Sequence, residues 1–534
     1  YDASPIRNKI LLGLDTSDSS PLIAKSTELP FLDNSIDVII SHHLLEFLDR
    51  PLDTLRELAR VSLPMGYFVV IGFNPISLWG LWKSAAGWNG KPPWFGKFIR
   101  PGRLMDWLNA LNFKIDRVQY CIYGLPISPN SLRTSDSSRE LSRNINLPLG
   151  AVYVLVARKQ ESTMTAITEA LGLSLPGASS IPAADSNHIR MSTDVGKRIV
   201  EMVWEDLTPS KIITEKSVDN AVTVAMAMGC STNAIIHLIA MARRAGVNLT
   251  MDDLDQKGRE IPLIANIRPS GKDYLMEDFF YAGGILALMH ELKEKLNLDE
   301  ITVSGLSLRK IISETKTIND DIIRPLDNPI YKEGSLAVLK GNLAPDGCVI
   351  KPAACDMKFF KHKGPAIVFD SYPEMKDIID RDDFNVTENH ILVLRNVGPV
   401  GGPGMPEWGM MPIPKKLLKK GVRDMVRISD ARMSGTSYGA CILHVAPESF
   451  IGGPLSLLET GDIIEIDIEL RSINMLVEKE TLSLRRKKIK PKEPKAGRGW
   501  LWMYSNHVTQ ANNGCDFDFL ETNFGKSAKE PDIF

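Results

Sequence analysis

The sequence lacks several features that would assign it to a special class of protein. No apolar run approaches the roughly 20 residues that a membrane-spanning helix needs, and no signal peptide is visible. The formal net charge is only −2, from 63 basic and 65 acidic residues, so no electrostatic argument for nucleic-acid binding arises. We therefore expect neither a membrane nor a nucleic acid as a partner. The chain opens on Tyr1 in place of Met, which indicates that it starts within a longer protein.

Cysteine is also scarce, and its spacing excludes a common kind of metal site. None of the six cysteines forms a CxxC pair, which argues against a structural zinc site. The composition is otherwise ordinary for a soluble protein, with 44% hydrophobic and 24% charged residues. A cytoplasmic protein with reduced thiols fits these features best. The cysteines are Cys121, Cys230, Cys348, Cys355, Cys441 and Cys515.

The chain of 534 residues is long enough for about three domains. Its hydrophobic pattern changes along the chain, from alternating strand and helix patterns, to a period near 3.6, and then to short alternating runs between turns. These patterns predict an α/β protein with an incomplete open sheet, a helix-rich part around a small parallel sheet, and a separate β-rich, barrel-like part. The expected segments are residues 1–160, 163–325 and 326–490, followed by a tail at 491–534.

Two turns rich in glycine each follow a strand-like run. The first, at residues 395–409, follows HILVLRNV and contains the carboxylate of Glu407. The second, at residues 430–438, follows DMVRISD and contains the hydroxyl of Ser434. Glycine beside a polar side chain lets the backbone and a ligand approach closely. The two turns therefore predict a site at strand ends built from these two side chains, unless both turns are merely strand connections.

The motifs GPVGGPGMPEWG and SDARMSGTSYG resemble the signature turns of the iron–sulfur-dependent dihydroxy-acid and sugar-acid dehydratases. The spacing from Glu407 to Ser434, 434 − 407 = 27 residues, is similar to that of the family. The resemblance covers residues 163–525 and lacks the family's N-terminal part. It implies that Glu407 binds Mg²⁺ and that Ser434 is the catalytic base. Backbone N–H groups of Gly435 and the side chain of Thr436 would orient the substrate carboxylate.

The resemblance also implies a reaction and two cofactors. EMVWEDLTPSKI and GCSTNAIIHLIA look closer to the sugar-acid branch, whose members convert a 2,3-dihydroxy (aldonic) acid into a 2-keto-3-deoxy acid with Mg²⁺ and an iron–sulfur cluster. The family's cluster cysteines and remaining metal ligands lie upstream of TMTAITEALG. Here that upstream region reads YVLVARKQES and has no cysteine. One carboxylate, Glu407, is a poor Mg²⁺ site by itself. We therefore expect this chain to be inactive alone.

Residues 1–158 resemble the C-terminal half of a class I S-adenosylmethionine-dependent methyltransferase. The resemblance lies in LPFLDNSIDVIISHHLLEF and GYFVVIGFNPISLWG. The glycine-rich turn that grips the cofactor is missing, because Gly13 is the only glycine in residues 1–28. We therefore expect no S-adenosylmethionine binding and assign no cofactor-binding residue. His42 and His43 are candidates for a substrate pocket, with a structural role as the alternative.

Three other features have simple structural interpretations. Cys230 stands where the family commonly has glycine, and we expect a small buried residue there and not a ligand. His237 lies on the apolar face of its predicted helix, which predicts a core histidine. The basic segment at residues 479–493 is interpreted as a solvated edge.

Three functional hypotheses follow. The first is a hydro-lyase of the sugar-acid dehydratase type, with a small sugar acid as substrate and a homo-oligomeric assembly as in the family. The second is a methyltransferase with a passenger domain, which the missing glycine-rich turn argues against. The third is a non-catalytic, chimeric remnant, because both resembling parts lack their cofactor-gripping N-terminal regions. A natural fusion and an artificial join near residues 160–163 remain as alternatives.

Overall fold

Contacts between Cα atoms divide the chain into two compact units in the computed structural model. Unit 1 is Tyr1–Glu161 with Pro182–Asp185, and unit 2 is Ser162–Ile181 with Ser186–Phe534. No helix among the described residues is long and apolar enough to cross a membrane. The structure describes residues 12–13, 22–31, 36–86, 94–111, 113–123, 147–159, 163–181, 186–274, 276–433, 438–489, 492–494 and 496–520.

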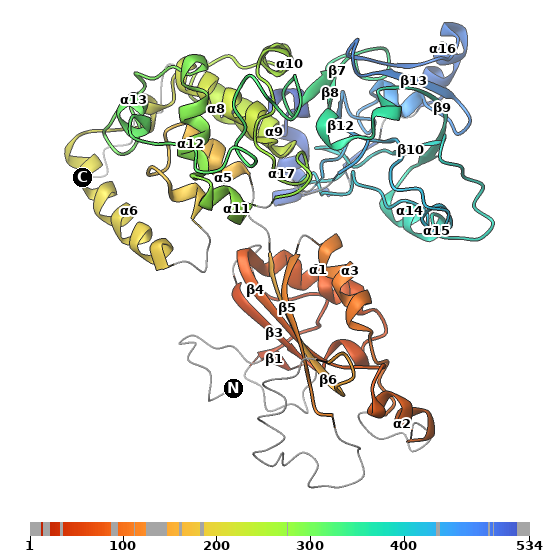
Figure 1. Ribbon diagram of the computed structural model, residues 1–534. Helices are drawn as coiled ribbons and strands as arrows, with labels where there is room; N and C mark the ends of the chain where they lie inside the picture. Colours follow the sequence, from red (N-terminus) through yellow and green to blue (C-terminus); the bar gives the residue numbers. More distant parts are fainter. Residues whose placement is uncertain are drawn as a thin grey trace, which may run out of the picture. The chain divides into compact units, whose positions relative to one another are not determined.

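Unit 1 is built on a four-stranded sheet with the order β3-β4-β6-β5 (Figure 1). β3 and β4 are parallel, whereas β6 runs antiparallel to both β4 and β5. A separate short pair is formed by β1 and β2. This is the predicted half of an open α/β sheet. The strands are β1 (Leu12–Gly13), β2 (Leu22–Ile23), β3 (Ile36–His42), β4 (Ser62–Phe73), β5 (Phe113–Cys121) and β6 (Val152–Lys159).

Among the described residues of unit 1, the helices beside this sheet are α1 (Pro51–Val61), α2 (Leu78–Ala86) and α3 (Pro101–Ala110). Pro51 occupies the first turn of α1, where its missing N–H costs no hydrogen bond. Apolar residues at helical spacing then turn one face of α1 inward, with Leu55 and Leu58 buried in the core of the unit. The same core takes Leu104 and Leu108 from α3. These side chains form a small hydrophobic core against the partial sheet.

The first part of unit 2 is helical, as predicted. Local signals set its helix ends: Thr214 and Ser217 form a capping box at the start of α8, and Gly229 ends that helix at φ +84°. The helices are α5 (Met164–Ala170), α6 (Ser186–Trp204), α7 (Pro209–Ile212), α8 (Glu215–Met228), α9 (Asn233–Arg244), α10 (Met251–Glu260), α11 (Met276–Tyr281), α12 (Gly284–Glu291) and α13 (Leu308–Ile312).

The small parallel sheet expected among these helices is not found in the described residues between 163 and 325. The apolar segment IPLIANI, residues 261–267, which is the strand-like run in this part of the sequence, makes only isolated bridges, such as Leu263 with Tyr331 and Ala265 with Ile323. Its apolar side chains are nevertheless buried in the helical core. An apolar run of this length indicates burial but does not distinguish a strand from an extended connection, so this prediction was wrong.

The second part of unit 2 is an eight-stranded sheet with the order β14-β13-β9-β10-β11-β12-β8-β7. β9, β10, β11 and β12 are parallel neighbours, and the outer pairs are antiparallel. The strands are β7 (Ala337–Leu339), β8 (Gly347–Ile350), β9 (Lys361–Phe369), β10 (Ile391–Leu394), β11 (Arg427–Ser429), β12 (Cys441–Ala446), β13 (Ile463–Asp467) and β14 (Ser472–Met475).

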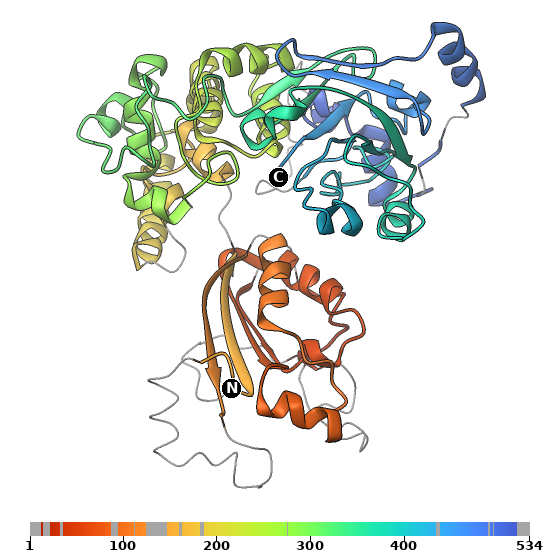
Figure 2. The ribbon, with the colours of Figure 1, turned by 45° about the vertical axis from the view of Figure 1, so that its right-hand side comes forward.

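The two ends of this sheet meet. Lys340, directly after β7, forms a parallel bridge with Ser472 in β14. Its N–H donates to the carbonyl of Arg471 at 2.9 Å, and its carbonyl accepts from the N–H of Ile473 at 3.1 Å. The curved sheet is visible in Figure 2. The predicted barrel-like architecture of this part is confirmed.

The register of the parallel strands gathers their carboxyl ends at one edge. Leu394, the last residue of β10, pairs with Phe369 of β9 and Ser429 of β11, which are also last residues. The segments that leave this edge include both glycine-rich turns. Loops at the carboxyl ends of parallel strands are the usual place for ligand sites. The remaining helices of this part and of the tail are α14 (Tyr372–Ile378), α15 (Lys415–Lys419), α16 (Lys479–Lys488) and α17 (Trp500–His507).

Candidate active site

A buried carboxylate at the end of β11 holds the start of the first glycine-rich turn. Asp430 is fully buried and accepts hydrogen bonds from the N–H groups of Asn396 (3.2 Å) and Val397 (3.1 Å). It also accepts from the N–H (2.9 Å) and the Oγ–H (2.6 Å) of Ser449. Burial raises the pKa of Asp430, and these four donors oppose that shift. One side chain thus ties β10, β11 and the segment after β12 together.

A second buried carboxylate, Glu448, holds the middle of the same turn. It accepts from the N–H groups of Val400 (2.8 Å) and Gly401 (2.9 Å) and from Nε2 of Gln510 (2.8 Å). Burial, reinforced by the nearby charge of Asp430, raises the pKa of Glu448 to about 7. A Cβ atom at Gly398 would lie 2.7 Å from Oε2 of Glu448, so only glycine fits there. Glu448 and Asp430 were not among the site residues predicted from the sequence, although Asp430 ends the strand-like run DMVRISD.

The turn ends at Glu407, which meets a residue from the second motif. Nδ2 of Asn233 donates to Oε1 of Glu407 at 2.9 Å. Nη1 of Arg432 lies 3.6 Å from the same oxygen, and Nε of Arg432 donates to the carbonyl of Met405 at 2.6 Å. The Glu407 side chain is 40% exposed. The structure therefore brings the first motif beside Arg432, two positions before Ser434.

The three other predicted site residues cannot be placed. Ser434, Gly435 and Thr436 lie outside the described residues, which resume at Tyr438. Their assignments as base and as substrate-orienting groups stay predictions from the resemblance.

Several buried polar atoms of Asn233, which contacts Glu407, of the preceding Thr232, and of His444, whose pKa is affected by Arg432, have no hydrogen-bond partner in the described part of the chain. They are Oγ1 of Thr232, Oδ1 of Asn233 and both ring nitrogens of His444. His444 adopts φ +57° within β12, an uncommon conformation for a residue with a side chain. Burial, together with the charge of Arg432, lowers the pKa of His444 to about 3, so its ring is neutral at physiological pH. Unsatisfied buried groups cost about 1–3 kcal/mol each and therefore point to a functional site.

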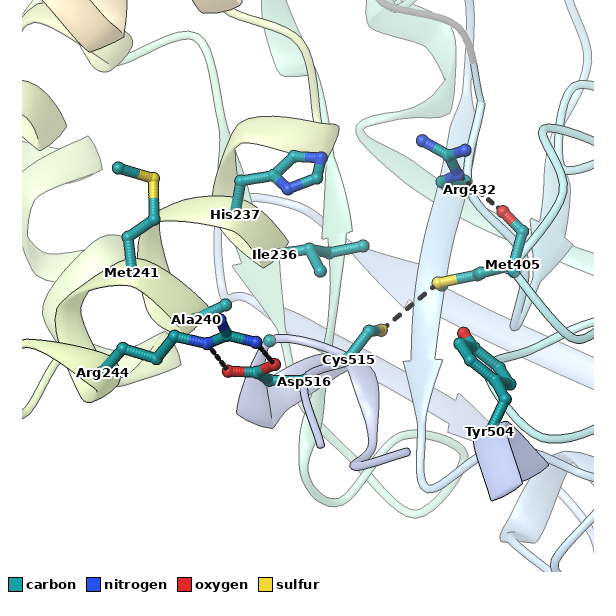
Figure 3. A pocket seen from close by; sticks show the side chains of 12 residues that line it. Ile236, His237, Ala240, Met241, Arg244, Met405, Arg432, Tyr504, Cys515 and Asp516 are labelled. Atoms are coloured by element: carbon teal, nitrogen blue, oxygen red, sulfur yellow. Dashed lines mark hydrogen bonds and ion pairs between the residues drawn. The ribbon is translucent and has the colours of Figure 1, made fainter. Parts of the chain in front are cut away.

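Figure 3 shows a cavity of about 450 Å³ that lies between α9, Met405, Arg432 and the residues around Cys515. Arg432 lines it and also contacts Glu407, so the cavity adjoins the end of the glycine-rich turn. Met405 and Cys515 line it as well, with their sulfur atoms 3.5 Å apart. On another wall, both carboxylate oxygens of Asp516 accept from Arg244 (Figure 3). The walls thus mix polar and apolar side chains.

His237 lines this cavity too, and it is not the core histidine that we expected. Its side chain is exposed, whereas its neighbours Ile235, Leu238 and Ile239 in α9 are buried. The apolar face of the helix is interrupted by the cavity wall, which the sequence pattern alone does not reveal. Partial removal of water and the nearby charge of Arg432 lower the pKa of His237.

The remaining candidate residues take structural positions. Cys230 is fully buried, as predicted, and burial raises its thiol pKa to about 12. In unit 1, the His43 ring stacks on Phe73 with 4.0 Å between the ring centroids, and its Nδ1 lies 3.3 Å from Oε1 of Glu46. These contacts favour the structural interpretation of His43. His42 is exposed at the end of β3, and a substrate-binding role for it stays a prediction.

The described residues do not by themselves fit a complete Mg²⁺ site or an iron–sulfur cluster. They contain no group of three or more His, Cys, Asp or Glu side chains that could hold a metal. Mg²⁺ needs about six oxygen ligands, whereas Glu407 and the amide oxygen of Asn233 are two, and Arg432 already lies against Glu407. The six cysteines form no disulfide. Three of them are buried and lie far apart in the sequence: Cys230, Cys348 and Cys441.

Models of known protein families match three stretches of the chain. The N-terminal domain of the dihydroxy-acid/6-phosphogluconate dehydratases matches residues 161–311, and the C-terminal domain of the same family matches residues 321–515. A methyltransferase domain matches residues 12–70. A similar solved structure is an S-adenosylmethionine-dependent methyltransferase from Thermotoga maritima, with 19% identity and a TM-score of 0.20, covering 26% of this chain and 63% of that one.

Several relatives of this chain are named as dehydratases. The chain is 51% identical over 375 residues to a 6-deoxy-6-sulfo-D-gluconate dehydratase of Pseudomonas putida, covering 70% of this chain and 64% of the relative. It is 44% identical to an L-arabinonate dehydratase of Rhizobium leguminosarum, covering 66% and 61%. It is 42% identical to a dihydroxy-acid dehydratase of Methanosarcina barkeri, covering 71% and 68%.

The chain thus spans a little less than two thirds of the length of the first two relatives. The family can be assigned from two findings. They are the match to the two dehydratase domains and the identity to the Methanosarcina barkeri enzyme. The chain belongs to the dihydroxy-acid/6-phosphogluconate dehydratase family, with part of a methyltransferase domain joined before its dehydratase portion.

Proposed function

We propose that unit 2 is the larger part of a hydro-lyase that converts a 2,3-dihydroxy sugar acid into a 2-keto-3-deoxy acid. The observation that carries this proposal is the meeting of Glu407, Asn233 and Arg432 at the carboxyl edge of the parallel strands, next to buried polar atoms without partners. Two of the relatives are named for sugar acids, a sulfogluconate and an arabinonate. The sugar-acid branch is therefore the better proposal than the branched-chain dihydroxy acids.

The chain's own residues have distinct tasks in this proposal. Ser434 takes the proton from C2 of the substrate, which requires a serine with a lowered pKa. The guanidinium of Arg432, two residues earlier, is a cation that would favour the alkoxide. Asn233 keeps Glu407 oriented through its 2.9 Å hydrogen bond. The neutral ring of His444 is a poor proton donor for the hydroxide that leaves C3.

We propose that the chain does not turn over by itself. Expulsion of the C3 hydroxide needs a strong acid, and the residues described around Glu407 supply none. In the family, an iron–sulfur cluster held by upstream cysteines would supply that Lewis acid, and Mg²⁺ would bind at Glu407. We further propose a cytoplasmic location, since all six thiols are free, and a homo-oligomeric assembly by resemblance to the family.

The residue assignments can be tested in a restored enzyme. The residues before Ser162 would be replaced by the N-terminal part of the Pseudomonas putida relative. In that protein, Ser434→Ala should lower turnover by about 10²–10⁴-fold while substrate binding survives, because only the base is lost. Glu407→Gln should instead weaken Mg²⁺ and substrate binding together. Full turnover in folded Ser434→Ala protein would refute the base assignment.

The inactivity can be tested on the chain as it is. After anaerobic reconstitution and gel filtration, iron and sulfide should remain far below one cluster per chain. Stoichiometric iron and sulfide would contradict the proposal and would make Cys230 the first ligand to examine. Tight S-adenosylmethionine binding in calorimetry would support the methyltransferase alternative. Neither cluster nor S-adenosylmethionine binding is the result expected for a non-catalytic remnant.

A further inference from the structure

A second cavity, of about 800 Å³, lies at the carboxyl edge of the parallel strands in unit 2. Its walls come from residues that directly follow three of these strands: Asp370 after β9, Arg395 after β10, and the segment 449–452 after β12. The end of α16 completes it with Lys488, and Lys492 follows a few residues later. Segments that leave the carboxyl ends of parallel strands commonly form ligand sites, and this volume is typical of a small-molecule pocket.

The cavity carries an excess of positive charge. Its one acidic side chain, Asp370, is engaged by Nε of Arg395 at 2.7 Å, and Arg395 is the main cause that lowers the pKa of Asp370. Nζ of Lys492 donates to the neutral amide oxygen of Asn396 at 2.7 Å. In the described part of the chain, neither Lys488 nor Lys492 forms an ion pair with a carboxylate. Lys492 lies near enough to Asp370 to help lower its pKa, but the cavity still sets three cations, Arg395, Lys488 and Lys492, against one carboxylate.

The rest of the lining is suited to a ligand with a polar and an apolar end. Oγ of Ser456 is buried and has no hydrogen-bond partner among the described residues. Nη1 of Arg395 is fixed by the carbonyl groups of Leu455, Ser456 and Leu458 at 3.3, 3.0 and 2.7 Å. That wall is therefore preorganised. The side chains of Phe450, Ile451 and Ile489 add apolar surface to the same cavity.

We propose that this cavity binds a small organic phosphate. A phosphate dianion offers several acceptor oxygens, which match the ammonium groups of Lys488 and Lys492 and the hydroxyl of Ser456. Inorganic phosphate would leave most of the 800 Å³ empty, so the phosphate carries an organic group that reaches the apolar wall. The basic segment 479–493, interpreted from the sequence as a solvated edge, thereby contributes to a binding site.

The site is separate from Glu407 but is connected to its turn. The amide oxygen of Asn396 accepts from Lys492. Asn396 lies near the start of the first glycine-rich turn, residues 395–409, which also contains Glu407. The N–H of Asn396 is held by Asp430 at 3.2 Å and by Ser449 at 2.7 Å, and Ser449 itself lines the cavity. A ligand that draws Lys492 away from Asn396 would change the contacts of the turn at its start. Binding itself requires no catalytic activity, so its test is independent of the proposed function.

The experiment is calorimetric titration of the full chain with glucose 6-phosphate at low ionic strength, with inorganic phosphate and glucose as further probes. We expect glucose 6-phosphate to bind most tightly, inorganic phosphate more weakly, and glucose not at all. Lys488→Ala and Lys492→Ala should each weaken glucose 6-phosphate binding by about tenfold or more, since each removes a charge-assisted hydrogen bond. Lys488→Arg should retain binding.

Lys487→Ala is the matched control, because Lys487 is the neighbouring residue of α16 but does not line the cavity. It removes the same charge and should leave binding unchanged. Equal losses in the Lys487 and Lys488 variants would mean nonspecific attraction and overturn the proposal. So would the absence of glucose 6-phosphate binding to the wild type, or unchanged binding in a Lys488→Ala, Lys492→Ala double variant whose melting temperature shows that it is folded. Equal affinity for glucose 6-phosphate and inorganic phosphate would refute the proposal that the ligand carries an organic group.

Discussion

Both units have strand ends that side chains hold in place through hydrogen bonds. The two units differ in how many such hydrogen bonds one side chain makes. In unit 1, the described sheet is open, and β3 pairs only with β4. The carboxylate of Glu46 holds one strand end there, accepting from the N–H of Phe73 at 2.7 Å. In unit 2, the sheet returns on itself through Lys340 and Ser472. Its strand ends are tied by Asp430, which accepts four hydrogen bonds from three residues.

This difference shows what a site needs beyond a packed core. Unit 1 retains a core, and in its described residues Glu46 and Asn74 support the end of β4, with Nδ2 of Asn74 donating to the carbonyl of Gly150 at 2.9 Å. Unit 2 retains a network in which buried carboxylates from β11 and from the segment after β12 fix a turn whose glycines allow close approach. Fixed turns can hold catalytic side chains such as Glu407 in place even where other parts of a site are missing. We therefore expect the anchoring carboxylates to dominate the energetics of unit 2.

The largest expected effect is that of Asp430→Ala. The substitution leaves the N–H groups of Val397 and Ser449 buried without their acceptor, whereas the N–H of Asn396 keeps Oγ of Ser449 at 2.7 Å; the loss should lower the unfolding free energy of unit 2 by about 3–5 kcal/mol. Urea denaturation followed by hydrogen exchange in β10 would measure it. The control is Asp370→Asn at the same sheet edge, where the carboxylate is 59% exposed and its pair with Arg395 should contribute about 1 kcal/mol or less. Similar losses in both variants would refute the anchoring role of Asp430.

The second effect is a pH dependence that Glu448 adds to unit 2. Its pKa is raised from 4.5 to about 7 in the folded state, so the folded state holds its proton more tightly than the unfolded state does. The stabilising contribution is therefore full below about pH 4.5 and is lost as the pH rises through 7. We expect this to remove roughly 2–3 kcal/mol of unfolding free energy between pH 5 and pH 8.

Other groups titrate in the same range, so the test must be differential. Glu169 has the same raised pKa of about 7, whereas His444, with its pKa lowered to about 3, acts in the opposite direction as the pH falls below its ordinary value of 6.5. Glu448→Gln removes one titration and leaves the others. The fall in stability between pH 5 and pH 8 should be smaller in this variant than in the wild type. Parallel pH profiles for the two proteins would contradict the assignment.

The positions of several strands in unit 2 were predictable from sequence, because short apolar runs alternate there with glycine and proline turns. The runs HILVLRNV and MVRISD contain β10 and β11 as expected. β12 and β14 were missed: SINM lacks clear turn signals, whereas CILHVA lies between a glycine-rich turn and Pro447 and was overlooked. The expected parallel sheet among the helices was wrong, because a short apolar run does not reveal whether it finds a pairing partner.

The site was predictable only where a motif marks it. Glu407 stood out because it ends a long glycine-rich motif, and the structure places it against Arg432 of the second motif. Asp430 and Glu448 were missed because their importance lies in backbone N–H groups that are distant in sequence. His237 was misassigned because helical periodicity identifies an apolar face but not the point where a cavity interrupts it. Tertiary contacts of this kind cannot be read from local patterns.

The smallest effect tests the unit 1 side of the comparison through Glu46→Gln. Glutamine retains a side-chain oxygen that can accept from the N–H of Phe73, so that bond survives in neutral form, whereas the contact with Nδ1 of His43 at 3.3 Å loses its charge. Charged acceptors form stronger hydrogen bonds than neutral ones, so we expect a loss of about 1 kcal/mol. Hydrogen exchange followed by mass spectrometry separates the units. Exchange should quicken in β4, while β10 should be unchanged, because both contacts of Glu46 lie within unit 1. A loss as large as that of Asp430→Ala would mean that one carboxylate supports unit 1 as strongly as the network supports unit 2. The two units would then differ in whether the sheet closes on itself, and not in how strongly carboxylates hold the strand ends.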